Sequence, residues 1–298
     1  MRATKTKGFT LTELIIVIVI MGILSTVVTP LIANKFSAVH QSTQRAHWVQ
    51  QAEYALFQIR QDLANSVPNS IFVDPLNADL VVEFLGAPPN AALYVARYRD
   101  QPNSTVNDRL QPNDDDIFDI FGAFDSPHPT YVSIGTSDAG DMRDDWGNLL
   151  AAGTTGTLAQ IDLMEPVVLD TSVTPAILLA PAETRITLPA KQKFGLGSPF
   201  FRAYFTNGPI AYECDMTKQL LYRVKAYVSL NPVFGFANRT DTSTPANRAR
   251  VIDSLIACSF ELTPGSTYQP PALRVSLEIG DSSETIQLVD TIVLSNGS

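Results

Sequence analysis

Residues 9–33 read FTLTELIIVIVIMGILSTVVTPLIA, an apolar run that contains a single charged residue. As an α-helix its 25 residues would extend about 37 Å at roughly 1.5 Å per residue, which exceeds a bilayer hydrocarbon core of about 30 Å. Arg2, Lys5 and Lys7 precede the run, and cations at one end of a membrane helix favour the cytoplasmic side. We therefore predict one membrane-spanning helix, with the basic end in the cytoplasm and the chain after about residue 35 exported.

A small residue, Gly8, stands before the apolar run and not after it. In an ordinary secretory signal the apolar core is shorter and the small-residue cleavage site follows it. Cleavage after Gly8 would instead leave the hydrophobic helix on the mature protein. The alternative interpretation is a plain membrane anchor that is not cleaved.

Glu13 is the one charge within the run. A carboxylate inside a membrane helix costs several kcal/mol unless it has a partner. Cleavage after Gly8 would create an α-amino group at Phe9, which is cationic near neutral pH. We expect this amine to be the partner of Glu13, from the same chain or from a neighbouring one.

The segment Lys7–Leu14, KGFTLTEL, resembles the class III leader of type IV pilins and type II secretion pseudopilins. The resemblance implies that a prepilin peptidase cuts after Gly8 and methylates the new amine of Phe9. It further implies that Glu13 is needed for filament assembly and that Pro30 bends the helix. The implied partners are the peptidase, inner-membrane lipid before assembly, and other minor and major pilins through the N-terminal helix.

Residues 34–67 are more polar but keep a helical pattern, with apolar residues at steps of three and four. This pattern predicts an amphipathic stalk helix that continues the transmembrane helix (9–33) to about residue 65. Pro68 and Asn69 are expected to end it. The apolar positions are Val49, Ala52, Leu56, Ile59, Leu63 and Val67.

From residue 68 the periodicity changes to two, which predicts a β-rich exported head over 68–298. We expect an α+β fold: the long N-terminal helix packed on an antiparallel β-sheet, with a second β region beyond it. The composition of about 100–160 predicts a loop-rich insertion, and Asn231–Arg250 a polar loop. Strands are predicted at 70–73, 80–85, 91–99, 161–169, 176–180, 184–188, 200–206, 209–214, 220–228, 252–262, 272–279 and 284–294, with short apolar islands at 117–121 and 131–134.

The chain has two cysteines, Cys214 and Cys258, without a CxxC spacing. Such a pair does not indicate a metal site, and in an exported protein it predicts one disulfide. The alternative is a pair of buried free thiols.

The formal charge of −9 argues against nucleic-acid binding. Without residues 1–8 the chain would carry 18 Lys and Arg against 30 Asp and Glu, a net charge of −12. Such a surface repels phosphate backbones, so we predict that the head does not bind nucleic acid.

The sequence lacks a Gly-rich phosphate loop, HExxH and Gly-x-Ser-x-Gly, so we predict no enzyme activity.

An acidic run and a nearby aspartate are weak calcium candidates: Asp114, Asp115, Asp116 and Asp119. Their spacing is not that of an EF-hand, and the alternative is a solvated acidic loop. A second cluster contains Asp138, Asp141, Asp144 and Asp145, followed by Trp146, which we expect to anchor its loop. We predict no cofactor, with calcium as the possibility to test.

Short segments of the head resemble minor-pilin-like proteins of the mannose-sensitive haemagglutinin (MSHA) pilus. The resemblance implies a structural subunit for initiation or capping and biogenesis of such a pilus, first in the bacterial inner membrane with a periplasmic head. Two alternatives are a tip adhesin that binds a surface or glycan, and a minor, J-like pseudopilin of a type II secretion system. The segments are Leu80–Phe84, Tyr94–Arg99, Phe118–Gly122, Ser198–Arg202, Gly208–Cys214 and Ala257–Phe260.

Overall fold

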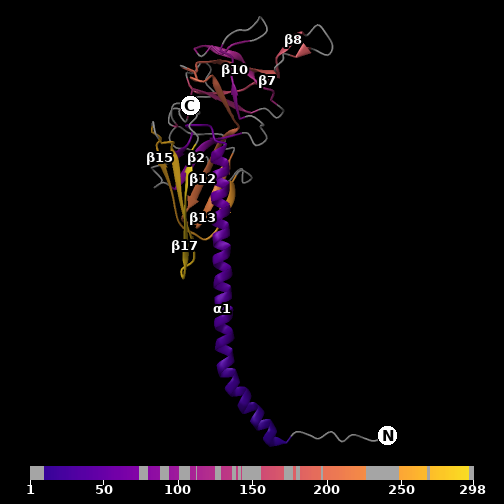
Figure 1. Cartoon of the computed structure of the whole chain (residues 1–298), viewed down its shortest axis with the longest axis vertical. Helices are drawn as coiled ribbons and strands as arrows, with labels where there is room; N and C mark the ends of the chain where they lie inside the picture. The colour runs from indigo at the N-terminus through magenta and orange to yellow at the C-terminus, as the bar shows by residue number, and fades with distance from the viewer. Residues whose placement is uncertain are drawn as a thin grey trace, which may run out of the picture. The chain divides into compact units, whose positions relative to one another are not determined.

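A computed structural model gives the architecture of the chain (Figure 1), which divides into two units, Met1–Gln50 and Gln51–Ser298. The residues that the structure describes are 10–73, 80–87, 94–100, 108–111, 113–124, 129–135, 139, 142, 156–170, 177–178, 182–195, 197–225, 248–266 and 269–294.

The only helix among these residues that is long and apolar enough to cross a membrane is α1, Leu11–Ala64, with 54 residues. Its exposed apolar side chains include Leu11, Ile18, Ile23, Phe36 and Val39. Pro30 lies inside the helix, where a proline lacks the N–H that would bond to the carbonyl four residues earlier. Figure 1 shows α1 bent within its N-terminal part, and a bend is the expected effect of an internal proline.

In the second unit, the C-terminal turns of α1 bury one face. The buried residues recur at three- and four-residue steps, as the sequence pattern predicts. After Ala64 the side chains of Asn65 and Ser66 donate to the carbonyls of Gln61 and Leu63, which satisfies acceptors that a helix end leaves open. The buried residues of this face are Ala52, Ala55, Leu56, Ile59 and Leu63.

A five-stranded antiparallel sheet lies beside this end of α1 (Figure 1), in the order β1-β2-β12-β13-β14. Its central strand β12 pairs with β2 on one side and β13 on the other. The strands are β1 (Phe72–Val73), β2 (Val81–Gly86), β12 (Gly208–Asp215), β13 (Leu220–Lys225) and β14 (Arg248–Ile252).

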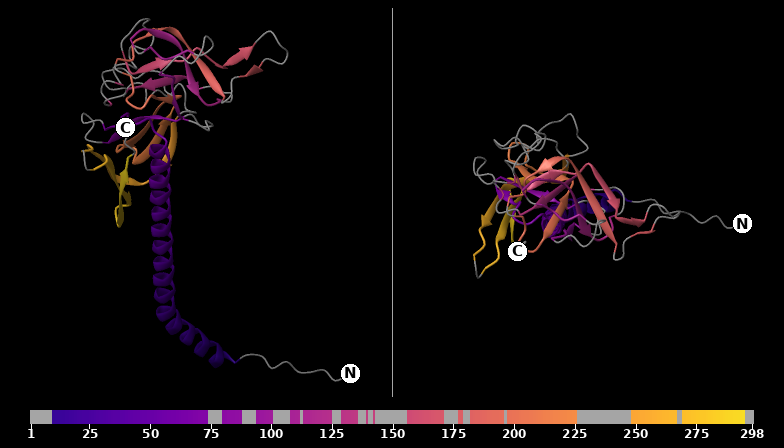
Figure 2. Two further views of the ribbon diagram at one scale, coloured as in Figure 1. Left: turned by 45° about the horizontal axis from the view of Figure 1, so that its top comes forward. Right: turned by 90° about the horizontal axis from the view of Figure 1, so that it is seen from above.

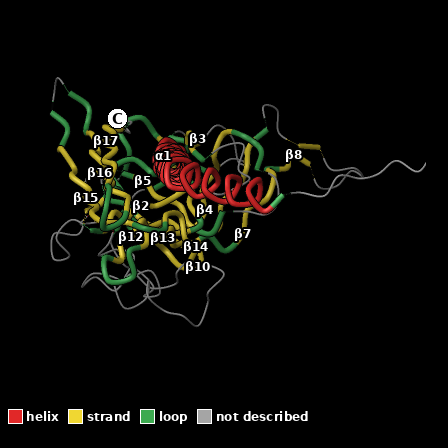
Figure 3. The backbone as a smooth tube through the Cα atoms, turned by 90° about the horizontal axis from the view of Figure 1, so that it is seen from below, coloured by secondary structure: helices red, strands yellow, loops and turns green. Residues whose placement is uncertain are grey.

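The chain ends in a three-stranded antiparallel sheet, β15-β16-β17, whose strands are neighbours in Figure 3. Fully buried Phe260, Leu273, Val275, Leu277 and Ile279 form one side of it. Its strands are β15 (Leu255–Thr263), β16 (Ala272–Gly280) and β17 (Thr285–Val293).

A second β region, drawn in magenta to salmon in Figure 2, lies apart from the yellow C-terminal sheet. Two antiparallel sheets, β3-β11-β5-β6 and β4-β10-β7, contribute to one core that includes Phe118, Ile186 and Phe205. The short strands β8 and β9 pair separately. The strands are β3 (Val95–Arg97), β4 (Asp115–Phe121), β5 (Tyr131–Ile134), β6 (Leu158–Gln160), β7 (Leu163–Pro166), β8 (Val168–Asp170), β9 (Ile177–Leu178), β10 (Glu183–Gln192) and β11 (Arg202–Thr206).

The predicted α+β class is confirmed: one long helix is followed by antiparallel sheets. Some details differ from the sequence-based expectation. The predicted strand over 161–169 is two strands, β7 and β8, which are separated at Val167. The predicted strand over 252–262 begins at Leu255, as β15, because Ser254, with a φ of 63°, turns the chain between β14 and β15. Arg248–Arg250, predicted to end a polar loop, begins β14 and pairs with β13.

Candidate assembly site

Thr10 and Glu13 form a reciprocal cap at the start of α1. The backbone N–H of Thr10 donates to Glu13 Oε2 at 2.9 Å, and the Thr10 hydroxyl donates to the same oxygen at 2.8 Å. The backbone N–H of Glu13 in turn lies 3.4 Å from the Thr10 hydroxyl oxygen. This arrangement is a capping box, which satisfies N–H groups that have no partner within the helix.

The cap gives Glu13 a partner that our sequence analysis did not anticipate, although Thr10-Leu11-Thr12-Glu13 matches the S/T-x-x-E signature. The carboxylate also lies at the helix N-terminus, where the helix dipole favours negative charge. Both bonds that Thr10 donates to Glu13 use Oε2, so Oε1 has acceptor capacity for a second donor. The Glu13 carboxylate can therefore cap its own helix through Oε2 and at the same time accept a hydrogen bond from an amine through Oε1.

The surface next to this cap is almost wholly apolar. Leu14, Ile15, Ile18 and Ile23 are each more than half exposed. Exposed apolar area costs about 25 cal/mol per Å² relative to burial. The N-terminal turns of α1 therefore need a lipid bilayer or other apolar helices around them.

The last turn of α1 is attached to the five-stranded sheet by an almost buried polar cluster. Arg223 donates to Asp62 through Nε at 2.7 Å and Nη2 at 2.9 Å, and the Tyr212 hydroxyl donates to the same carboxylate at 2.5 Å. Burial, followed by the negative charge of Asp62, raises the pKa of Tyr212. The phenol therefore stays protonated and remains a donor at physiological pH.

Two further contacts attach this part of α1 to the C-terminal strands. Gln51 Nε2 donates to Asp253 Oδ1 at 2.9 Å, just after β14. Arg60 Nη2 lies 2.5 Å from Asp290 Oδ2 on β17. The helix end thus has polar contacts with elements on both sides of its buried face.

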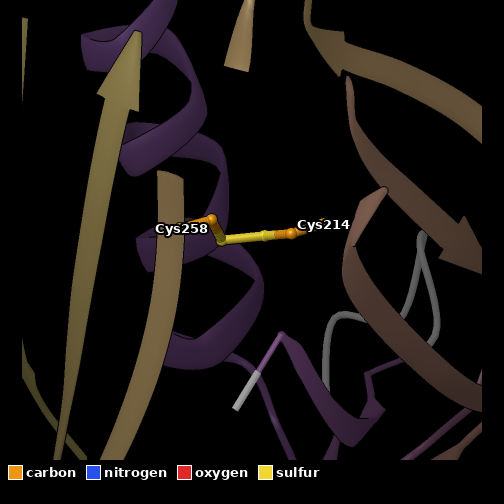
Figure 4. Close-up of a disulfide and its surroundings, with 2 residues drawn as sticks. All are labelled: Cys214 and Cys258. Atoms are coloured by element: carbon orange, nitrogen blue, oxygen red, sulfur yellow. A yellow bond between two sulfur atoms is a disulfide. The ribbon is translucent and has the colours of Figure 1, made fainter. Parts of the chain in front are cut away.

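The structure joins Cys214 at the end of β12 to Cys258 in β15 (Figure 4), with a Cα–Cα distance of 6.4 Å. The two residues are 44 positions apart in the sequence. The bond therefore links the five-stranded sheet to the C-terminal sheet.

The acidic run does not gather its carboxylates around one point. Asp119 is fully buried and receives both Arg185 Nε at 2.9 Å and Arg185 Nη2 at 3.1 Å. Asp114 pairs with Lys191 at 3.1 Å on the surface. Burial raises the pKa of Asp115, which accepts the backbone N–H of Gln111 at 2.6 Å.

These partners give Asp119, Asp114 and Asp115 structural roles. Within the described ranges, no group of three or more His, Cys, Asp or Glu side chains is arranged to hold a metal ion. The second acidic cluster (Asp138, Asp141, Asp144 and Asp145), Trp146, and the predicted cleavage residues Gly8 and Phe9 lie outside the described residues.

Residues 4–29 match the prokaryotic N-terminal methylation motif. No curated protein and no solved structure matches the chain. The match covers Gly8, Phe9 and Glu13, and it supports a type IV prepilin-like class III leader at this end of the chain. It therefore supports a pilin-like or pseudopilin-like subunit that is processed by a prepilin peptidase, and the apolar helix is consistent with an inner-membrane anchor.

Proposed function

We propose that the protein is a minor-pilin-like structural subunit, resembling MshO, that helps to initiate or cap a type IV pilus of the MSHA type. One observation carries this proposal: the methylation motif at 4–29 overlaps the start of the 54-residue helix α1, and a β-rich head follows that helix in the chain. The order of the short head segments from Leu80 to Phe260 supports the MSHA type.

The proposed mechanism begins in the inner membrane, with the leader in the cytoplasm and the head in the periplasm. After cleavage, the apolar part of α1 leaves the lipid and packs among the helices of other pilins. The Glu13 carboxylate, held by Thr10 at its own helix start, accepts the terminal amine of a neighbour. This pairing neutralises two buried charges and fixes the axial register of the incoming subunit.

Processing provides a direct test of the leader. We expect the mature protein to begin with N-methyl-Phe9, which mass spectrometry of the N-terminal peptide would detect. Gly8→Val should block cleavage, because the peptidase would meet a branched side chain at the cut. Gly8→Ala is the matched control with the smallest added side chain. An intact Met1 terminus in cells with an active prepilin peptidase would contradict the assignment.

Deletion of the protein tests the role in assembly. We expect cells without it to show few or no surface filaments while they still make normal amounts of the major pilin, because initiation precedes elongation. Counting filaments by electron microscopy and assaying adhesion in parallel distinguishes the two functions. Normal filament numbers with lost adhesion would contradict an assembly role and support a tip adhesin.

A further inference from the structure

Among the strands that the structure describes, β17 is a long sheet edge that pairs with β16 alone. It has nine residues, lies at the end of the order β15-β16-β17, and keeps a continuous register with β16 over all nine pairs. Natural edge strands are usually protected by shortness, charge, proline, bulges or a cover. β17 has no proline or bulge, and its one charged residue is Asp290.

The other described sheet edges have such protection. β1, β3, β6, β8 and β9 have two or three residues each, β7 has four and includes Pro166, and β14 has five with Arg248 and Arg250. β4 contains three aspartates. β15 contains Glu261 and a bulge, and its Cys258 is bonded to β12. Among the described edge strands, β17 is therefore the one that combines nine residues, an unbroken register and a single charged residue.

The hydrogen bonds at the two ends of β17 show which of its backbone groups face outward. Leu294 N donates to Pro271 O at 2.9 Å, and Asp281 N donates to Glu284 O at 2.9 Å. Bonded and non-bonded pairs alternate in an antiparallel ladder, so even-numbered residues of β17 bond to β16. The odd-numbered residues direct their N–H and C=O groups to the open edge: Thr285, Gln287, Val289, Thr291 and Val293.

The side chains of these odd-numbered residues are all exposed, and none is charged. Val289 is 47% and Val293 65% exposed. Thr and Val are residues that β-strands prefer, and cross-strand pairs of β-branched side chains stabilise a ladder. This surface fits an additional extended strand with uncharged facing residues.

The neighbouring surface of α1 also favours an added strand. Arg60 of α1 contacts Asp290, on the face of β17 that carries the even-numbered side chains. Phe57 lies three residues earlier on the helix, about 60° further from the buried face at 100° per residue, and is 60% exposed. A strand placed beyond β17 would extend the sheet on the Arg60 side of α1, the side toward which Phe57 lies.

We propose that β17 is a strand-addition site that receives an extended strand from a neighbouring pilin-like subunit in the filament. Main-chain hydrogen bonds to the odd-numbered residues supply the pairing, and an apolar side chain of the added strand packs on Phe57. The inference rests on the proposed function, because it takes the added strand from an assembly partner. It assigns to the head a subunit contact separate from that of the N-terminal helix.

Along β17, N–H groups that bond to β16 alternate with N–H groups that face the open edge. This alternation provides a sharp test in cells that make the full-length chain. Val289→Pro removes an N–H that points to the open edge and none that bonds to β16, and proline is tolerated on edge strands. Val289→Lys keeps that N–H but adds a charge at the proposed interface, and Val289→Thr is the matched control. Leu288→Pro removes an internal ladder bond and serves as the control for damaged folding.

We expect Val289→Pro, which loses one interface hydrogen bond, and Val289→Lys, which places an unpaired charge in the interface, each to reduce the amount of the chain in sheared filaments about tenfold. Val289→Thr should assemble normally, and all three should keep the wild-type melting temperature, which Leu288→Pro should lower. Normal assembly of folded Val289→Pro would overturn the strand-addition site but not the proposed function. If the proline variant misfolds, normal assembly of Val289→Lys would have the same meaning. A wild-type chain absent from filaments would overturn both it and the proposed function.

Discussion

Replacing Glu13 with valine is expected to leave the chain in the membrane but to remove it from filaments. The substitution makes the apolar run more hydrophobic, so insertion should not suffer. It removes the negative charge that would neutralise a neighbour's terminal amine, and an unpaired buried charge costs about 3–5 kcal/mol. Quantifying the chain in membrane and sheared-filament fractions would show the expected loss.

The cap at Thr10 requires a second variant, because valine also removes the bond to the Thr10 N–H. Loss of a helix N-terminal cap costs about 0.5–2 kcal/mol. Glu13→Gln retains an acceptor oxygen for the cap but has no charge. If charge pairing drives assembly, the glutamine variant should be as defective as the valine variant. Normal assembly of Glu13→Gln would show instead that the cap, and not the charge, is the essential feature.

Loss of the disulfide is expected to have the second large effect. Cys214→Ser should destabilise the head by about 4 kcal/mol on the chain-entropy argument for a loop of this size. For a domain of roughly 250 residues this corresponds to a fall in melting temperature of about 10 °C. Thermal unfolding of the purified full-length chain, with its disulfide intact, provides the reference.

The Cys214–Cys258 disulfide defines the matched controls for Cys214→Ser. Cys258→Ser should give the same melting temperature as Cys214→Ser, and the double variant should be no less stable than either single one, because all three lack the same bond. Wild-type protein treated with a reductant should behave likewise. Two cysteines that react with a thiol reagent in denatured, unreduced protein would contradict the pairing.

Local sequence patterns predicted the elements whose determinants are close together in the chain. The apolar run predicted α1. The buried face of the helix was predicted by the three- and four-residue spacing of Ala52, Leu56, Ile59 and Leu63. The determinants of the capping box are equally local, because Thr10 lies three residues before Glu13 in the S/T-x-x-E pattern. The isolated carboxylate in an apolar run also indicates a charged partner, and this second signal alone underlies the prediction of an amine partner.

The order of strands could not be predicted in the same way, because it depends on contacts between distant residues. Asp62 and Arg223 are separated by 161 positions, and neither residue carries a signal for the other. β2 pairs with β12 across more than a hundred residues. The open edge of β17 likewise became apparent only once the sheet order was known.

The disulfide also changes what a single backbone cut can do to the head. Cys214 and Cys258 close a covalent ring that contains the chain through β13 and β14 to the start of β15. A protease that cuts anywhere within this ring produces two termini but no separate fragment, because the sulfur bridge still connects the two parts. An exported subunit with such a ring retains its C-terminal sheet, including β17, after a nick that would divide an unbridged chain.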